Sequence, residues 1–489
     1  MAKSIVELLD KHGPMLSGQL AKIYEQENHA NNANARKAIS RARSPVQKNK
    51  LLSFQNNQVF LYLEKQYMSQ QYWDSLIACI FEFSKSTATF ILPLMRQGGI
   101  MSKEVLPAYV MSPTENLTGH KRYDIMYDNL EKSKIITDYD DDYVQLSQTY
   151  FSRTQTFNFS RAKAIELSKK LVLTDFYDML RKTNVISYNN GRLWSNFAKF
   201  QWAFTAPSYL YGISKWDTKK QSFNPGFIIA DIVLLKNTSL NDVMFFIEKV
   251  NIIKSYKNIQ NFIPVLIVDS LNPDVFDYLK SQSIAIAFID RLFGDRYKLL
   301  LEDLVNVMTN ATAMVLNNPQ KVDQIFDNLL KEDGRYNNIV GDLFELLVAE
   351  LYRNIGVNYL EINKQVPAHQ TKSGKPKEID VLADKNGIIY IIECKATKSM
   401  IDETFVEKWL SEKIVDIHTY LTTIYSGKRF EFQLWSIGGF TSTALDLLEK
   451  AKQSTEKYRI DYFNKSRMLS FAKDNNVVSF TQRIKKHFA

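Results

Sequence analysis

The sequence predicts a multidomain protein in which α+β modules come first and α/β layers follow. The chain has 489 residues, which is more than one hydrophobic core usually holds. Hydrophobic residues make up 45% of it and aromatic residues 12%, as in folded domains with substantial cores. Segments with a helical spacing of apolar residues alternate with short apolar runs bounded by Gly, Asn or Asp, a pattern typical of mixed folds.

Composition excludes several classes of protein. Two cysteines, Cys79 and Cys394, are too few for a disulfide framework or a cysteine zinc cluster. No apolar run reaches the length of a bilayer span, and the first residues lack the pattern of a secretion signal, so we expect a cytoplasmic protein with no membrane partner. No GxxxxGK[ST] motif is present, so we expect no nucleotide cofactor. The formal net charge of +9 favours a polyanionic partner.

The first segment, residues 1–66, predicts three helices followed by a hairpin. The third helix is expected over Asn32–Arg43, where four small or apolar residues share one face at the spacing i, i+3, i+4, i+7: Ala35, Ala38, Ile39 and Ala42. A hairpin is expected in LLSFQNNQVFLYL, with its turn at Asn56-Asn57. The other face of the third helix carries the candidate DNA-binding residues Arg36, Lys37, Ser40, Arg41 and Arg43.

Three helices and a hairpin resemble the winged-helix family, and the resemblance implies that the third helix reads DNA. The alternative is that its basic residues are only a solvated helix face. The second segment, residues 67–150, repeats the same order and ends in an acidic hairpin, TDYDDDYVQLS. Because its carboxylates would repel phosphates, we expect a winged-helix-like module that packs against protein.

The third segment, residues 151–325, begins with a helix expected around Arg161–Arg181. We interpret GFIIADIVLL and DVMFFIEKVNII as two apolar strands of a hairpin, which would place Asp231 near Glu248. The next residue on the face of Glu248 would be Val250, with Lys249 on the other face. A carboxylate pair without a lysine beside it predicts a degenerate, noncatalytic copy of the α/β layer that follows.

The fourth segment, residues 326–489, contains the strongest local signal. The dipeptide Asn386-Gly387 between two apolar runs predicts a two-residue hairpin turn. Counting outward from this turn places Asp380 directly opposite Glu393, with Lys395 on the same face as Glu393. Facing carboxylates are destabilising unless a cation lies between them, so this hairpin predicts a cation site.

Other elements of the fourth segment repeat the order of the third. A helix expected over about Asn338–Asn354 carries Glu345 among apolar neighbours. After the hairpin, a further helix is followed by FEFQLWSIGGFTSTALDLL, which reads as strand then helix, and by YRIDYF as a last strand. The similar order in IPVLIVDSLNPDVFDYL of the third segment indicates two copies of one fold.

These residues resemble the PD-(D/E)xK nuclease superfamily, and the fourth segment is similar to the Mrr-type restriction endonucleases. Asp380 matches the family's motif aspartate, Glu393 its second carboxylate and Lys395 its lysine. Glu345 matches its helical glutamate. The chain departs from the motif before Asp380, where a Glu-Ile pair stands in place of proline. The resemblance covers roughly the last third of the chain, and implies restriction-endonuclease-like α/β domains, the third segment degenerate and the fourth intact.

The residue types suit phosphodiester hydrolysis with a bound cation. Mg²⁺ prefers carboxylate, carbonyl and water oxygens, and Mn²⁺ can substitute for it. The expected ligands are Asp380, Glu393, the backbone carbonyl of Cys394, and Glu345. Lys395 would position the attacking water or stabilise the developing charge. The alternative is a purely structural, buried ion pair between Glu393 and Lys395, which leaves Asp380 and Glu345 without a role.

We therefore expect a metal-dependent endonuclease that acts on double-stranded DNA, in restriction or anti-phage defence. One active site cuts one strand, so cleavage of both strands would involve a homodimer, sequential nicking or a partner subunit of a defence system. Two alternatives stay open: a noncatalytic DNA-binding or assembly subunit, and an RNA-directed nuclease.

Overall fold

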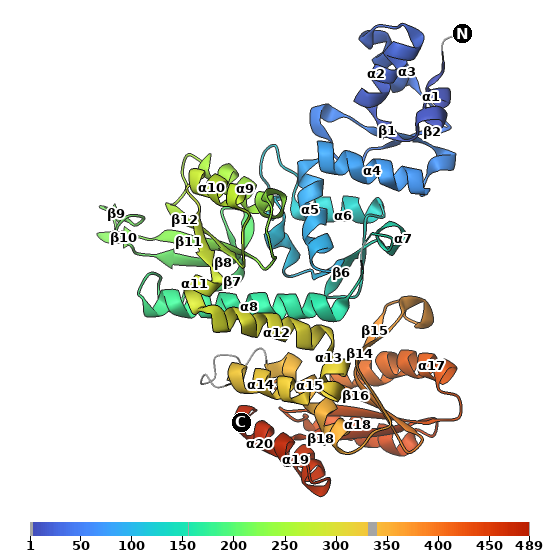
Figure 1. Ribbon diagram of the computed structural model, residues 1–489, viewed down its shortest axis with the longest axis vertical. Coiled ribbons are helices and arrows are strands. Elements are labelled where there is room, and N and C mark those ends of the chain that lie inside the picture. Colours follow the sequence, from blue (N-terminus) through green and yellow to red (C-terminus); the bar gives the residue numbers. More distant parts are fainter. Residues whose placement is uncertain (1–2, 155, 331–339, 489) are drawn as a thin grey trace. The chain divides into compact units, whose positions relative to one another are not determined.

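The computed structural model describes residues 3–154, 156–330 and 340–488, which form a mixture of helices and sheets (Figure 1). The mixed α/β class expected from the sequence is confirmed. Contacts group the chain into two compact units. The N-terminal unit comprises Met1–Ala162 and Val172–Gly294, and the C-terminal unit comprises Lys163–Leu171 and Asp295–Ala489.

The N-terminal unit begins with a module of three helices and a small sheet. Ser4 caps the first helix, and its backbone N–H donates to Glu7 Oε2 at 2.6 Å, which completes a capping box. The three strands pair in the order β1-β3-β2. The elements are α1 (Ile5–His12), β1 (Met15–Leu16), α2 (Ser17–Asn28), α3 (Asn32–Arg41), β2 (Val46–Asn49) and β3 (Phe60–Leu63).

The hairpin of this module differs from the one expected. Its first strand is β2, and the expected strand LLSF instead forms the connection to β3. The side-chain oxygen of Asn49 accepts hydrogen bonds from the backbone N–H groups of Leu51 and Leu52, which bends the chain away from the sheet. Leu52 and Phe54 are buried in a hydrophobic core, so these residues serve packing rather than strand pairing.

A second module repeats the topology of the first. Its strands pair in the order β4-β6-β5, so in both modules the last strand lies between the other two. The elements are α4 (Gln70–Phe83), α5 (Lys85–Arg96), β4 (Ile100–Ser102), α6 (Tyr123–Lys132), β5 (Ile136–Asp138), β6 (Tyr143–Leu146) and the short α7 (Gln148–Phe151).

A five-stranded sheet completes the N-terminal unit, with the order β13-β12-β11-β8-β7. The pairs β7–β8 and β8–β11 are antiparallel, and β11–β12 and β12–β13 are parallel. Helices α9 and α10 connect the parallel strands. The elements are α8 (Phe159–Lys182, of which Lys163–Leu171 belongs to the C-terminal unit), β7 (Arg192–Phe197), β8 (Phe200–Ser208), β11 (Gly226–Val233), α9 (Leu240–Lys254), β12 (Phe262–Val268), α10 (Pro273–Ser281), β13 (Ala285–Phe288) and α11 (Ile289–Phe293).

Helix α9 stands where the sequence analysis expected a strand, so the predicted pairing of Asp231 with Glu248 is wrong. The helix begins with a capping box in which the backbone N–H of Ser239 donates to Asp242 Oδ2 at 2.9 Å. Apolar residues at helical spacing are buried along it: Val243, Phe246, Ile247, Val250 and Ile253. Glu248 lies on the outer side and pairs with Lys85.

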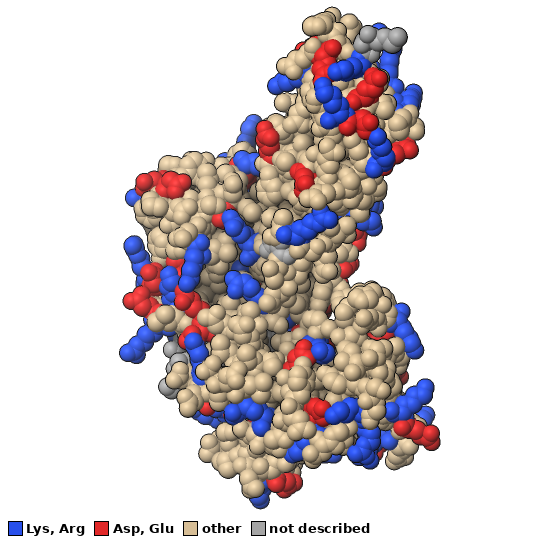
Figure 2. All heavy atoms as spheres, turned by 45° about the vertical axis from the view of Figure 1, so that its right-hand side comes forward, with Lys and Arg blue, Asp and Glu red and all other residues tan. Residues whose placement is uncertain are grey.

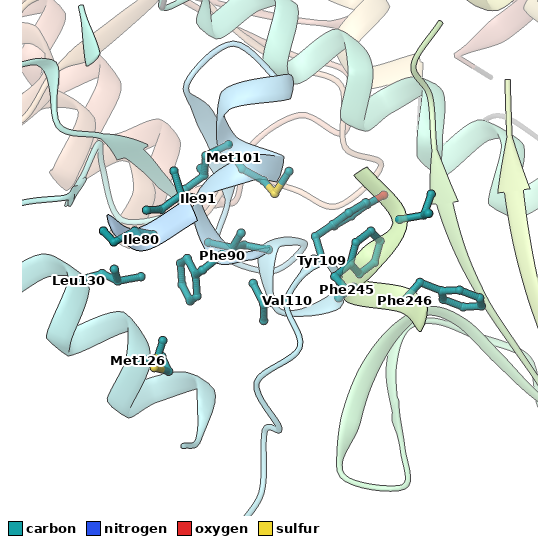
Figure 3. Packing of buried hydrophobic residues seen from close by; sticks show 14 of the residues in the cluster. Ile80, Phe90, Ile91, Met101, Tyr109, Val110, Met126, Leu130, Phe245 and Phe246 are labelled. Carbon is teal, nitrogen blue, oxygen red and sulfur yellow. The ribbon is translucent and has the colours of Figure 1, made fainter. Parts of the chain in front are cut away.

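The second module packs on the five-stranded sheet through a shared hydrophobic core. Phe90 and Tyr109 of the module lie in the same cluster as Phe245 and Phe246 of α9 (Figure 3). The hydroxyl of Tyr109 donates to the carbonyl oxygen of Ile232 at 2.7 Å. The second module therefore buries an apolar surface against protein, as the sequence analysis expected.

The C-terminal unit contains a second five-stranded sheet, in the order β14-β15-β16-β17-β18. Its elements are α12 (Asp295–Thr309), α13 (Ala311–Asn317), α14 (Pro319–Leu330), α15 (Val340–Asn354), β14 (Tyr359–Val366), β15 (Lys377–Lys385), β16 (Ile388–Lys395), α16 (Glu403–Lys408), α17 (Ile414–Ile424), β17 (Arg429–Ser436), α18 (Ser442–Ser454), β18 (Arg459–Asn464), α19 (Lys465–Asp474) and α20 (Val478–His487). Residues 338 and 339, where the helix of Glu345 was expected to begin, lie outside the described residues.

The two five-stranded sheets share one topology. In each, the first three strands in sequence are antiparallel neighbours and the last two add in parallel, each after a helical connection. The repeat expected from strand-then-helix order is therefore present in the strand order of both sheets. Strands β8 and β11 of the first sheet correspond to β15 and β16 of the second.

Within the described ranges, no single helix is long and apolar enough to cross a membrane. Two bent helix pairs, α4 with α5 and α12 with α13, pass the same test of length and composition. The apolar residues of α4 and α5 are buried in the core of the N-terminal unit.

Candidate active site

The β15–β16 hairpin has the register that the sequence predicts. Asn386 and Gly387 both have positive φ angles, 53° and 79°, as a two-residue turn of this kind requires. Strand pairs run from Lys385–Ile388 to Val381–Ile392, and the next step along both strands brings Asp380 to Glu393. The backbone N–H of Cys394 donates to Asp380 Oδ2 at 2.7 Å, which ties the two strand ends together.

Three carboxylates are buried at this end of the sheet. Asp380 and Glu393 are each 5% exposed and Glu345 is 9% exposed. Glu345 comes from α15, where Phe344, Leu346 and Leu347 around it are all buried, so the packing of the helix fixes it inside. Lys163, in the part of α8 that belongs to the C-terminal unit, lies 4.0 Å from Glu345 Oε1. Lys395 contacts Glu393 at the same end of the sheet, and Glu345 lies near enough for its charge to raise the pKa of Lys395.

Two lysines contact Glu393. Lys395 Nζ lies 2.8 Å from Glu393 Oε1, and Lys413 pairs with the other oxygen, Oε2. The ion pair between Glu393 and Lys395, which was the alternative to a metal site, is therefore present, but it is part of a larger cluster. Asp380 lies beside this cluster and is not included in either ion pair.

Lys413 is the site residue that sequence reasoning missed. It ends a π-helical turn, Trp409–Lys413, which lies between α16 and α17. Such turns are rare and are frequently found at functional sites. A signal was present in the sequence, because the buried residues Trp409 and Ile414 are five positions apart, where a regular helix would space them by three or four.

Burial and neighbouring charge separate the two facing carboxylates. Burial, helped by the negative charge of Glu393, raises the pKa of Asp380 to about 6. Burial also acts to raise the pKa of Glu393, but Lys395 and Lys413 together outweigh it and lower that pKa to about 2. Asp380 is therefore the carboxylate that gains most from a further cation.

The lysine and cysteine of the motif have settled protonation states. Burial acts to lower the pKa of Lys395, but Glu393 and Asp380 outweigh it and raise that pKa above its ordinary value. Lys395 is therefore a cation at neutral pH and suits an electrostatic role rather than that of a general base. Burial raises the pKa of the Cys394 thiol, so the thiol stays protonated at neutral pH.

Carboxylate and carbonyl oxygens are the ligands that a hard divalent cation prefers, but in the described residues these groups do not surround a single position. In the part of the chain that the structure describes, no group of three or more His, Cys, Asp or Glu side chains converges enough to hold a metal ion. Both carboxylate oxygens of Glu393 contact lysine ammonium groups. A cation bound by Asp380 and Glu393 would take the place of at least one of these lysines.

The matching position in the N-terminal sheet also holds a carboxylate. Asp231 pairs with Leu266 two residues before the end of β12, just as Glu393 pairs with Leu434 two residues before the end of β17. Asp231 therefore corresponds to Glu393. By the same register, Val233 corresponds to Lys395.

Alanine takes the place of the second carboxylate in the N-terminal sheet. Strands β8 and β11 pair up to Phe204–Ala230, and the next step brings Ala203 to Asp231. Ala203 thus corresponds to Asp380, and its backbone N–H donates to Asp231 Oδ1 at 2.7 Å. The N-terminal sheet lacks both the second acid and the lysine of the motif.

Asp231 nevertheless has a lysine partner, which the sequence analysis placed on the wrong face. Lys249 of α9 lies with its Nζ 2.6 Å from Asp231 Oδ2, and both side chains are fully buried. The same ammonium group donates to the carbonyl oxygens of Ala108 at 2.6 Å and Gln201 at 2.9 Å, and lies 4.1 Å from the ring centre of Trp202. This closed pair joins α9 to the second module and to β8.

The predicted DNA-binding residues lie on an accessible part of the first module. Ala35 and Ile39 bury one face of α3. The expected basic residues are all exposed, although Arg43 lies beyond the helix, which ends at Arg41. Among the described residues, none of the four cations forms an ion pair: Arg36, Lys37, Arg41 and Arg43. On the face seen in Figure 2, basic and acidic side chains are interspersed over this module.

No protein-family model, curated protein or solved structure matches the chain.

Proposed function

We propose that this protein is a metal-dependent endonuclease that hydrolyses phosphodiester bonds of double-stranded DNA at Asp380, Glu393 and Lys395. The observation that carries the proposal is the placement of Asp380. Its carboxylate is buried next to Glu393, and burial with like charge raises its pKa. Such an arrangement costs stability, and a bound divalent cation would offset that cost.

The roles follow from the residue types. The proposed ligands of Mg²⁺, or of Mn²⁺ in its place, are Asp380, Glu393, the carbonyl oxygen of Cys394, and Glu345. When bound, the cation would neutralise charge that develops on the phosphate oxygens. Lys395 would hold the attacking water or the phosphate with its ammonium group. Lys413 would hold Glu393 in place when no cation is present and release it when one binds.

In this proposal, other parts of the chain bind the DNA target. The first module resembles a winged helix, and α3 with its unpaired cations would contact DNA. The C-terminal unit resembles an Mrr-type restriction endonuclease, which favours a role in cytoplasmic restriction or anti-phage defence. A homodimer or a partner subunit would place a second active site on the opposite strand.

A second candidate is a noncatalytic DNA-binding or assembly subunit. The observation that favours it is the lysine pairing at Glu393, which resembles the closed Asp231–Lys249 pair of the N-terminal sheet. If Lys395 and Lys413 serve only to neutralise Glu393, the C-terminal sheet would be a scaffold as well. The position of Asp380 argues against this, because a scaffold does not need a second buried acid.

The test is cleavage of supercoiled plasmid, with a structured RNA in parallel, in the presence of Mg²⁺, Mn²⁺ or a chelator. We expect the wild-type protein to nick or linearise plasmid only with metal, and Asp380→Asn to be inactive. Asp384→Asn is the matched control: this aspartate lies on the same strand and pairs with Lys428 at 2.8 Å, away from the site. An Asp380→Asn protein that cuts like wild type would overturn the assigned site, and cleavage of RNA alone would overturn the assigned substrate.

A further inference from the structure

A short β-ribbon in the N-terminal unit has no role in the proposed site. It consists of β9 (Lys215–Asp217) and β10 (Ser222–Asn224) and is inserted between β8 and β11. The two strands pair only with each other and extend away from the five-stranded sheet (Figure 1). We refer to residues 209–224, the ribbon with the loop before it, as the ribbon segment.

The ribbon segment exposes an unusual concentration of large apolar side chains. Tyr211 is 93% exposed, Trp216 50% and Phe223 48%. Tyr209 and Leu210 are exposed as well. Trp216 and Phe223 face each other across the ribbon, with ring centres 5.0 Å apart and planes at 74°. A cluster of exposed aromatic residues generally marks a binding surface. Exposed apolar area is unfavourable in water, and a bound partner would cover it.

The ribbon is held in shape by its own hydrogen bonds. Asp217 Oδ1 accepts from the backbone N–H groups of Lys219 at 3.0 Å and Lys220 at 3.1 Å, and Oδ2 accepts from Asn224 Nδ2 at 3.1 Å. These bonds, that from Lys220 above all, lower the pKa of Asp217. The one carboxylate of the segment is thus engaged in shaping the turn.

The base of the ribbon segment is fixed by a close approach of two backbones. A Cβ atom at Gly226, the first residue of β11, would lie 2.7 Å from the carbonyl oxygen of Ile213 and 2.8 Å from that of Asn261. Only glycine therefore allows the loop to lie against the sheet. A fixed base and a hydrogen-bonded turn present the exposed rings with little loss of conformational freedom on binding.

The charge of the ribbon segment indicates what it binds. Lys215, Lys219 and Lys220 are exposed, and in the described part of the chain none of them forms an ion pair. With three lysines and the single aspartate, the segment carries a net charge of +2. Rings beside unpaired cations match a nucleic-acid strand, whose bases stack on aromatic rings and whose phosphates attract lysines.

We propose that the ribbon segment binds unpaired nucleotides, with Trp216 and Phe223 stacking on bases and the three lysines contacting phosphates. The class of ligand rests on the proposed function, because a nuclease must hold a nucleic acid. Unpaired nucleotides are favoured over duplex because base faces in a duplex are covered by their neighbours. The ribbon would hold a frayed end, a gap or a displaced strand next to a duplex target.

The test is fluorescence anisotropy with the full-length chain carrying Asp380→Asn, so that no substrate is cut. The probes are a labelled oligothymidylate and a labelled duplex. For Trp216→Ala with Phe223→Ala, we expect the affinity for the single strand to fall by about 10- to 100-fold, since stacking contributes strongly for each base. The affinity for duplex should change less than about twofold.

Three variants make the result decisive. Tyr278→Ala removes a ring that is exposed on α10 of the same unit and should leave both affinities unchanged. Trp216→Tyr with Phe223→Tyr keeps stacking rings and should retain most of the single-strand affinity. Lys215→Gln, Lys219→Gln and Lys220→Gln together should weaken the binding and its dependence on salt.

Unchanged single-strand affinity in the double alanine variant would overturn the proposal, and so would an equal loss for duplex and single strand. If only binding to a protein partner is lost, the segment is a protein-docking surface and the proposal is wrong. Because the assay measures binding with cleavage disabled, its outcome is independent of whether the wild-type chain cuts DNA.

Discussion

The two five-stranded sheets have the same strand order and the same carboxylate–lysine pair, but only one of them carries a second acid. Asp231 with Lys249 in the N-terminal sheet corresponds to Glu393 with Lys413 in the C-terminal sheet. Ala203 and Val233 occupy the positions of Asp380 and Lys395. A carboxylate paired with a lysine from the following helix is thus common to both sheets. Asp380 and Lys395 are present only in the C-terminal sheet, and the proposed cleavage of DNA depends on them.

The two sites also differ in the solvent exposure of their side chains. The side chains of Asp231 and Lys249 are fully buried, whereas those of Lys395 and Lys413 are 33% and 22% exposed. Solvent therefore reaches the lysines of the C-terminal pair but neither member of the N-terminal pair. The comparison teaches that the same kind of carboxylate–lysine pair is closed to solvent in one sheet and partly open to solvent in the other.

Removing the lysine of the closed pair should have the largest effect on stability. Lys249→Ala leaves Asp231 buried without its cation, and we expect a loss of about 3–5 kcal/mol in the free energy of unfolding. Urea denaturation followed by circular dichroism measures this. Asp231→Leu with Lys249→Met, which removes both charges, should recover part of the loss, because it still leaves the backbone groups of Ala203, Ala108 and Gln201 without these partners. A loss below about 1 kcal/mol for Lys249→Ala would show that the pair is not structural.

The corresponding change in the open pair should cost less. Glu393→Gln leaves Lys395 and Lys413 without their shared anion, but both lysines can reach water. We expect a loss of about 2–3 kcal/mol at pH 7. Because the pKa of Glu393 is lowered in the folded state, its stabilisation is present above about pH 4.5 and is lost as the pH falls toward about 2. A wild-type stability that does not decline over this range, relative to Glu393→Gln, would contradict the assigned role.

Asp380→Asn, in contrast, should stabilise the folded protein. The folded-state pKa of Asp380 is raised to about 6, so its ionised form destabilises the folded protein at higher pH. We expect Asp380→Asn to raise the free energy of unfolding by about 1–3 kcal/mol at pH 8 in the absence of metal. The gain should shrink as the pH falls through about 6 and vanish near pH 4. A destabilised Asp380→Asn protein at pH 8 would mean that the carboxylate is there for structure.

The smallest effect is expected at the matched control on the same strand. Asp384, whose side chain is 13% exposed, pairs with Lys428, whose side chain is 35% exposed, and a pair with one well-solvated partner contributes little. Asp384→Asn should change the stability by less than about 1 kcal/mol and leave cleavage intact. Thermal unfolding and the plasmid assay together check this, and a loss of activity would show that changes anywhere on β15 disturb the site.

Local chemistry in the sequence was sufficient to predict the C-terminal hairpin. Asn386-Gly387 selects one turn, and period-two counting from it brings Asp380 to Glu393. The same reasoning failed at α9, because this helix is buried on nearly all sides and its apolar run reads equally well as a strand. The capping box at Ser239 was the signal that distinguishes the two.

Contacts between residues far apart in the chain could not be predicted from the sequence alone. Lys413 reaches Glu393 across twenty positions, and a π-helical turn sets its direction. Lys249 reaches Asp231 only because α9 is a helix. Leu52 and Phe54 look like strand residues but fill a core. In each case tertiary packing fixes where the side chain lies.

The central claim is that Asp380 and Glu393 hold a divalent cation that the N-terminal sheet does not. Isothermal titration of Mg²⁺ or Mn²⁺ into the full-length protein tests this directly. We predict one binding site in the wild type, its loss in Asp380→Asn, and its retention in the variant with Asp231→Leu and Lys249→Met. Metal binding that survives Asp380→Asn, or that is lost when the N-terminal pair is removed from a folded protein, would contradict the claim.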